Sequence, residues 1–117
     1  MKMRTVFFCL MVAVATAEQA SPPGAAFMKV MDASMQKMDR EMVTAPMDGN
    51  IDHDFAIMMM PHHQGAIEMA EAELNYGKDP VMRRLAQEIV VDQRSEIDAM
   101  LLWLNKNTAD KWTKRRR

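Results

Sequence analysis

The sequence predicts an all-α protein, a small helical bundle built from three main helices. Aromatic residues make up 6% of the 117 residues and glycine occurs four times, a composition that suits helices better than a β-sandwich. Methionines recur at spacings of three and four residues between Met28 and Met42, which is the period of one helix face. Gly77 followed by Asp79 and Pro80 marks the end of one helix and the start of the next. A chain of this length is expected to form a single domain.

Residues 1–17 have the pattern of a cleaved signal peptide. Lys2 and Arg4 precede an apolar run over residues 5–15, and small residues follow that run. Cleavage before Glu18 would export the protein, so we expect a periplasmic location.

The same segment is too short to hold the protein in a membrane. A bilayer-spanning helix needs about 20 apolar residues, so no stable anchor is expected. A lipoprotein would need a small residue before Cys9, but Phe8 stands there. A non-cleaved amphipathic helix is the remaining alternative. Cleavage also removes Cys9, the only cysteine, which leaves no disulfide, no thiolate ligand and no nucleophilic cysteine.

The charge of the mature chain excludes one class of partner. Loss of Lys2 and Arg4 leaves 13 basic residues against 16 acidic ones, a net charge near −3. Nucleic-acid-binding domains carry a basic patch or stripe, so no nucleic-acid partner is expected. Without disulfides, a mature chain of about 100 residues must draw its core from helix packing, which a second copy or a bound metal can complete.

The first helix is expected over residues 26–43, after a flexible segment at residues 18–25 that contains two prolines and a glycine. Five methionines with spacings of 3, 4, 3 and 4 lie on one seam of this helix. Leucine would provide the same seam with better-defined rotamers. An adaptable packing face and a bank of thioether ligands are therefore both open interpretations. The five residues are Met28, Met31, Met35, Met38 and Met42.

The second helix should begin near Asp52 or Asp54, either of which can cap it, and it should end at Tyr76. It follows a connecting loop over residues 44–53. His53 lies at the edge of this loop and is interpreted as a surface histidine, with metal binding left open as the alternative.

Two residues inside the second helix are costly for ordinary helix formation. Pro61 removes a backbone donor at a cost of about 3 kcal/mol or more, so the helix either kinks there or starts again at the proline. We expect a kink. Gly65 is expected to let a neighbouring helix come close.

The third helix should run from Pro80 to about Asn105 and complete a helical domain over residues 26–106. A basic tail over residues 107–117 is expected to be a frayed, solvated end. Within the third helix, Gln93 and Glu96 stand on an inner seam where hydrophobic residues are expected.

Buried polar groups need hydrogen-bond partners. Gln93 and Glu96, together with Glu73 of the second helix, are therefore candidates to hold histidines by their second ring nitrogen. The alternative is a seam that is partly exposed and wetted by solvent.

Residues 54–76 contain the candidate metal ligands. At about 100° per residue, positions three and four apart share a helix face, so a thioether and an imidazole can converge without another segment. The alternative is a core helix whose methionines fill space and whose histidines are hydrogen bonded. His63 lies on the flank of the stripe, and the group formed by Met59, His62, His63 and Met69 favours metal binding. The stripe consists of Phe55, Met59, His62, Ala66, Met69 and Glu73.

The first helix can add ligands across the loop. An antiparallel hairpin pairs positions roughly equidistant from its turn, so Met42 should lie near the start of the second helix. Met38 or Met35 is then the best donor at the level of the histidines. The predicted metal ligands are Met35, Met38, Met42, Met59, His62, His63 and Met69.

The types of ligand indicate copper. Thioethers are soft donors that select Cu(I), and imidazole binds copper in either oxidation state. Zinc more usually takes cysteine or three firm nitrogen and oxygen ligands. A thioether has no proton to lose, so such a site should survive mild acidity better than one built from imidazoles. We predict a preference for Cu(I) and Ag(I) over Zn(II).

Three stretches of the chain carry a family resemblance, and they read FAIMMMPHHQGAIEMA, ELNYGKDP and LAQEIVVDQRSEIDAMLLWL. They are similar to the CopM-like periplasmic copper metallochaperones, a ferritin-like helical family, and the similarity covers about residues 35–104. It implies a helical bundle of the bacterial cell envelope that binds copper through histidine and methionine. Some relatives carry two such units in tandem, whereas this chain carries one. The matching positions are Asp54, Phe55, Met59, His62, His63, Gln64, Ala66, Ile67, Met69, Ala70, Gly77, Gln93, Glu96, Met100 and Trp103.

The resemblance also implies a role in copper delivery or in copper resistance by sequestration, with other envelope copper-transport proteins as partners. The residues expected to support the ligands are Asp54, Glu73, Gln93, Glu96 and Met100.

Two other classes of function stay open. A methionine-rich helical protein without metal could dock a partner helix on its seam or serve a structural role. A ferritin-like di-metal oxidase would bring a Glu-x-x-His motif from each of two helices, and none occurs in this sequence. No enzyme activity is expected, because no nucleophile and base pair and no pair of carboxylates stands out. Three helices leave one face uncovered, and a homodimer that forms a four-helix-type bundle is the expected closure.

Overall fold

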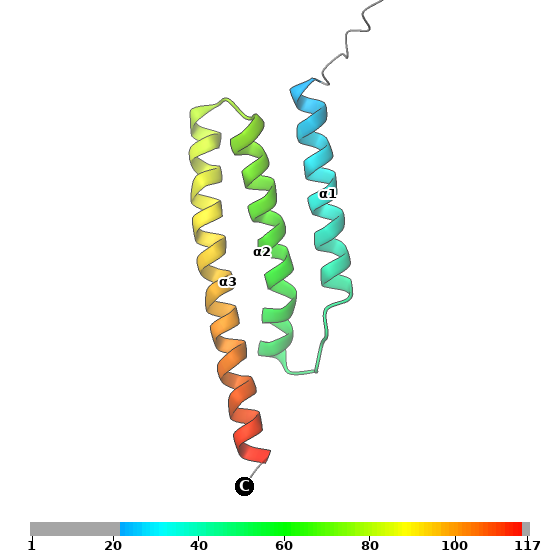
Figure 1. Ribbon diagram of the computed structural model, residues 1–117, viewed down its shortest axis with the longest axis vertical. Helices are drawn as coiled ribbons and strands as arrows, with labels where there is room; N and C mark the ends of the chain where they lie inside the picture. The colour runs from blue at the N-terminus through cyan, green and yellow to red at the C-terminus, as the bar shows by residue number, and fades with distance from the viewer. Residues whose placement is uncertain (1–21, 116–117) are drawn as a thin grey trace, which may run out of the picture.

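The computed structural model describes residues 22–115, which form three helices joined by short loops. Figure 1 shows the helices side by side in one layer, with the second helix in the middle and antiparallel to both neighbours. The predicted all-α bundle of three helices is therefore confirmed for this part of the chain. The predicted signal peptide, residues 1–17, lies outside the described residues. The helices are α1 (Pro23–Val43), α2 (Ile51–Tyr76) and α3 (Pro80–Arg115).

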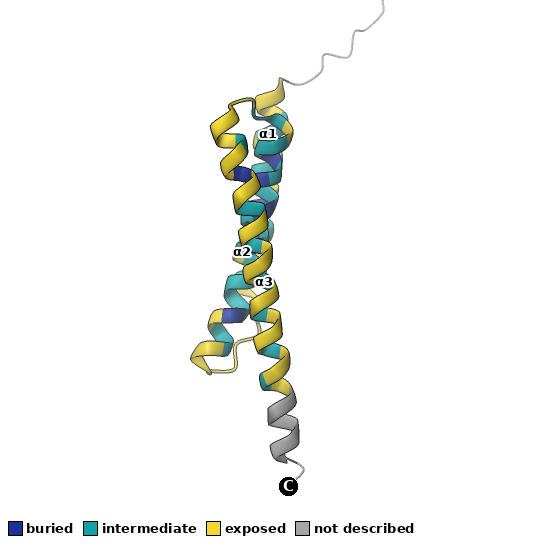
Figure 2. Ribbon diagram, turned by 90° about the vertical axis from the view of Figure 1, so that its left-hand side faces the viewer, coloured by how far each residue is buried: buried dark blue, intermediate teal, exposed yellow. Residues whose placement is uncertain are grey.

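Helix α2 makes every contact between helices in the described part of the chain. It packs against α1 on one side and α3 on the other, while α1 and α3 do not contact each other. Small side chains let two helix backbones approach closely, so the core is a thin contact and not a wide apolar interior. Figure 2 shows how little of the layer is buried. The buried residues of α2 are Ala56, Gly65, Ile67, Ala70 and Ala72.

The close approach predicted at Gly65 is confirmed. A Cβ atom added to Gly65 would lie 3.0 Å from Sδ and 3.1 Å from Cβ of Met38 on α1. Helix α2 also continues through Pro61, so the alternative of a new helix starting at the proline is wrong. Because proline has no N–H group, the carbonyl of Ile57 loses its usual helical partner there.

The start of α2 differs from the prediction, because Asn50 caps the helix and neither Asp52 nor Asp54 does. The Asn50 side-chain oxygen accepts from the backbone amides two and three residues further on, at 3.0 and 3.2 Å. Asp54 instead accepts from the amides of Asp48 and Gly49 across the loop, at 2.9 and 3.0 Å. Gly49 has a φ of 84°, in the left-handed region that glycine adopts without strain.

The turn between α2 and α3 follows the prediction. Helix α2 ends at Tyr76, and Oδ1 of Asp79 accepts from the amides two and three residues further on, at 2.9 and 3.0 Å. Helix α3 starts at Pro80. Arg83 stabilises this turn, because its guanidinium donates hydrogen bonds to the backbone carbonyls of Leu74 and Gly77.

Two helix boundaries differ from the prediction. Helix α1 starts at Pro23, three residues early, because proline suits the first position of a helix. Helix α3 continues to Arg115, past the predicted end at Asn105, and residues 105–115 contain neither glycine nor proline to stop it. The predicted flexible segment and basic tail are therefore partly helical. No helix within residues 22–115 is both long and apolar enough to cross a membrane.

The register between α1 and α2 also differs from the prediction. Lys37 pairs with Glu68, and Met38 faces Gly65, so Met42 lies level with residues 61–63 of the antiparallel helix. The prediction placed Met35 or Met38 at that level.

The path of the loop explains this difference. The prediction assumed that residues equidistant from the turn face each other. Instead, the loop continues past the end of α1 and runs alongside the first turns of α2, as Figure 1 shows. Ala45 and Pro46 accordingly line one groove together with Ile57 and Met60.

Alanine at position 65 should destabilise the fold, although alanine favours helices by roughly 1 kcal/mol over glycine. The added Cβ would press on the Cβ of Met38, which the α1 backbone holds in place, and overpacking costs about 1–3 kcal/mol. We expect a net loss of free energy of unfolding on the order of 1 kcal/mol in urea titrations. Gly24→Ala is the control and should not destabilise, because no atom lies within 4 Å of the added Cβ. A Gly65→Ala protein more stable than the parent would contradict the close packing.

Acid should weaken the contact between α1 and α2. The hydrogen bond from Lys37 to Glu68, at 2.6 Å, is the largest cause that lowers the pKa of Glu68 below its ordinary value of 4.5. Because the folded pKa lies below the unfolded one, this stabilisation is present above the unfolded value and is lost as the pH falls through the folded value. We expect the unfolding free energy to fall below pH 4.5, and Glu68→Gln to flatten that fall. An exposed control, Glu88→Gln, should keep the parent slope, and equal slopes in all three proteins would refute the assignment.

Candidate metal site

His63 lies between α2 and α3, with its two ring nitrogens in different surroundings. Nε2 is 2.5 Å from Oε2 of Glu96 on α3. Nδ1 is buried and has no hydrogen-bond partner among the described residues. The His63 side chain is 12% exposed and that of Glu96 is 56% exposed. Because a carboxylate accepts, Nε2 is assigned as the donor, and the lone pair of neutral imidazole is then on Nδ1.

This Nδ1 atom is well suited to bind a metal. It is the one buried side-chain nitrogen or oxygen without a partner in the part of the chain that the structure describes. An unsatisfied buried polar atom costs about 1–3 kcal/mol, and in native proteins an ion or water commonly accounts for it. A metal-binding histidine usually donates its other N–H to a carboxylate, as His63 does to Glu96.

His62 adds a second imidazole beside the first. The two ring centroids are 5.9 Å apart and the rings are inclined by 62°. Two imidazoles that bind one ion, each at about 2.0 Å from nitrogen to metal, have centroids about 5–6 Å apart. His62 is exposed, so an ion held here would remain reachable from solvent.

Met59 supplies the nearest thioether by helical geometry. It is half-buried and precedes His63 by four residues. Side chains on a helix lean toward its N-terminus, so His63 leans over the turn that carries Met59. A thioether and an imidazole are thus available from one turn of α2.

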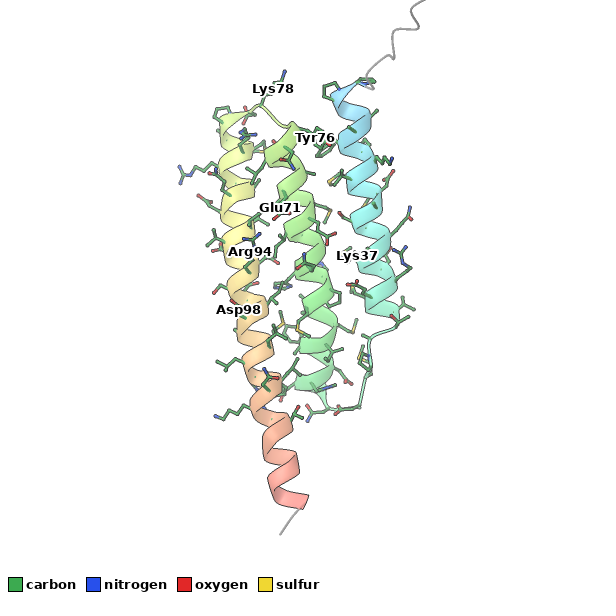
Figure 3. All side chains as sticks on the ribbon, viewed as in Figure 1. Lys37, Glu71, Tyr76, Lys78, Arg94 and Asp98 are labelled. Carbon is green, nitrogen blue, oxygen red and sulfur yellow. The ribbon has the colours of Figure 1, made fainter. Side chains whose placement is uncertain are left out.

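Two ion pairs hold the neighbouring helices to α2, both of them on the C-terminal side of this turn. Lys37 of α1 binds Glu68 at 2.6 Å, and Arg94 of α3 binds Glu71 at 2.9 Å. Figure 3 labels Arg94 and Glu71 on α3 and α2. The pair between Arg94 and Glu71 joins α3 to α2 within three turns of His63, so it helps to fix the position of Glu96 relative to the imidazole.

Because α1 and α3 do not touch, grooves lie over opposite faces of α2. A groove of about 350 Å³ lies over the face that carries Ala66, Met69 and Glu73. Another, of about 460 Å³, lies over the face that carries Met60 and Gln64. At about 100° per residue, these two sets of positions point in opposite directions from the helix axis.

The structure separates Met69 from the histidines. Met69 follows His62 by seven residues, about 10 Å along the helix, and it lines the 350 Å³ groove with Met31 and Met82. Met38 packs on Gly65, one turn after His62. The roles of these residues as ligands stay predictions.

The remaining predicted ligands lie on α1. Met42 is half-buried and level with the histidines, while Met35 is exposed and lies closer to the level of Met69. Met42 is thus the first-helix thioether that the register favours.

The predicted supporting residues are spread along the layer. Glu96 is hydrogen bonded to His63, whereas Gln93 is half-buried one turn earlier on α3. Glu73 lines the groove around Met69, and Met100 lines a groove of about 300 Å³ between α2 and α3.

Asp54 belongs to a separate cluster with His53 and Asp48 at the start of α2. Nδ1 of His53 is 3.3 Å from Oδ1 of Asp48 and 3.1 Å from Oδ1 of Asp54. The amide of Asp48, followed by His53, lowers the pKa of Asp54 below its ordinary value. These three side chains are close enough together to hold an ion. Their hydrogen bonds to one another also hold the loop in place, which explains the cluster without a metal.

Sequence analysis missed Met31 and Met82 as neighbours of Met69. Periodicity placed Met31 on a seam of the first helix. The periodicity of one helix does not show which residues of different helices lie at the same level. The path of the first loop determines this.

Comparison with known proteins identifies a family and a similar protein. The family described as "Domain of unknown function (DUF305)" matches residues 8–104. Uncharacterized protein L153 of Acanthamoeba polyphaga mimivirus is 43% identical over 42 residues, which are 36% of this chain and 28% of that protein. The match thus spans less than a third of the viral protein.

Proposed function

We propose that this chain, which belongs to the DUF305 family, is a periplasmic copper-binding protein that holds Cu(I) through histidine and methionine. One observation carries the proposal. His63 donates from Nε2 to Glu96, and its Nδ1 atom is buried without a partner among the described residues. The carboxylate fixes the ring orientation and makes Nδ1 a stronger donor toward a metal.

The neighbouring donors favour a soft monovalent ion. Met59 on the same turn is a thioether, a type of donor that selects Cu(I) and, by the same softness, Ag(I). Imidazole and thioether ligands are neutral, so they do not compensate the positive charge of an ion that is partly buried. The penalty for burying charge rises steeply with its size, so a monovalent ion is preferred to Zn(II).

Accessibility supports a role in transfer or storage and not in turnover. His62 is exposed beside the buried Nδ1 of His63, so an ion can enter and leave without unfolding the layer. The resemblance to CopM-like metallochaperones and the expected signal peptide favour exchange with other envelope copper-transport proteins, or sequestration in copper resistance.

The surface favours a second candidate function, the docking of a partner. Phe55 is 62% exposed and Trp103 is 37% exposed, and both line the groove of about 300 Å³ with Met100. Exposed aromatic residues around a groove are typical of a surface that receives a helix. A second copy of the chain would be one such partner.

Cu(I) binding tests the proposal most simply. Under reducing, oxygen-free conditions, competition with a Cu(I) chelator should show tighter binding of Cu(I) than of Zn(II).

Replacing both His62 and His63 by alanine should abolish the tightest site. Glu96→Gln should weaken the site by about 10–100-fold, because His63 loses its charged partner. Met59→Leu should also weaken it, with little loss of stability since leucine conserves volume.

His53→Ala is the matched control, since it removes a histidine of α2 that lies in the separate loop cluster. It should bind Cu(I) like the parent protein. Unchanged binding in the double histidine variant, or equal or tighter binding of zinc by the parent, would refute the proposal.

A further inference from the structure

We infer that the groove lined by Met31, Met69 and Met82 is a second site for a soft monovalent metal ion, built from thioethers without histidine. The inference rests on the proposed function, because it assumes that this chain encounters Cu(I). It adds a separate site with a different set of ligands and raises the capacity of each chain by one ion.

Each of the three helices contributes one methionine to this groove of about 350 Å³. Met31 of α1 and Met69 of α2 are half-buried, while Met82 of α3 is 47% exposed at the rim. Methionine has three rotatable side-chain bonds, so each sulfur can turn into the groove without movement of its helix. Such a site would have both a protected interior and a route to solvent.

The charge of the groove suits a cation. Among the described residues, Glu73 is the one charged residue that lines it, and no lysine, arginine or histidine does so. The other lining residues are apolar, among them Phe27, Leu85 and Ile89. A carboxylate in apolar surroundings compensates a single positive charge, while three neutral thioethers provide the soft donors that Cu(I) and Ag(I) prefer.

The groove is separate from the histidine site. Met69 follows His62 by seven residues, which is about 10 Å along α2, and Met31 lies still further from the histidines in the antiparallel register. The ligands proposed for the groove, Met31, Met69 and Met82, include neither histidine, so the two sites share no residue. The two sites can therefore be emptied independently by substitution.

Titration with Ag(I), counted by native mass spectrometry, tests the inference. The triple variant Met31→Leu/Met69→Leu/Met82→Leu should bind one ion fewer per chain than the parent and keep the ion that depends on histidine. The His62→Ala/His63→Ala variant should lose the other ion and keep the one in the groove. With methionine methyl groups labelled with carbon-13, the signals of Met31, Met69 and Met82 should shift together in that histidine variant.

A matched control replaces three methionines that do not line the groove, Met28, Met47 and Met60, by leucine. It should bind as many ions as the parent. An unchanged count in the groove variant, or an equal loss in the control, would overturn the inference while leaving the histidine site intact. A parent protein that binds no Ag(I) would overturn both this inference and the proposed function.

Discussion

The rest of the structure depends on one constraint: the middle helix, α2, contacts two helices that do not contact each other. Within residues 22–115, α2 alone touches both α1 and α3. It does so through small residues, and Gly65 packs directly on Met38. Because the backbones come this close, the layer holds together with a narrow core.

This arrangement leaves the methionines in an intermediate position. In a closed bundle they would be buried as packing residues, and in a single helix they would be fully solvated. Met31, Met42, Met59 and Met69 are half-buried, and Met31 and Met69 line the open groove of about 350 Å³. Thioethers in such places are protected from competing solvent but can still be reached by an ion, which is the condition for reversible binding. A bound ion would in turn stabilise the layer, since it binds the folded chain and not the unfolded one.

The features predicted correctly from the sequence are those that depend on local chemistry. The stop at Gly77 and the start at Pro80 follow from neighbouring residues, and so does the close approach at Gly65. Glu96 was found in the same way, because a charged residue on an apolar seam needs a partner and His63 is that partner.

The features that were missed depend on the path of the chain through space. The loop after α1 runs alongside α2 before the chain turns back, and this shifts the register. Met42 thereby reaches the level of the histidines, and Met31 comes to the groove of Met69. No periodicity within one helix contains that information. Helix α3 is also longer than predicted. No residue after Asn105 marks the end of a helix, so the local sequence did not determine where α3 ends.

The central claim is that one ion is held by imidazole nitrogen and thioether sulfur together, at the turn of α2 that faces Glu96. X-ray absorption at the copper edge, on protein loaded with one equivalent of Cu(I), measures the atoms bound to the ion directly. The account predicts both sulfur and imidazole nitrogen in the first shell, with the imidazole contribution lost when His62 and His63 are replaced by alanine. A first shell of nitrogen and oxygen alone, or imidazole scattering that persists in that variant, would contradict it.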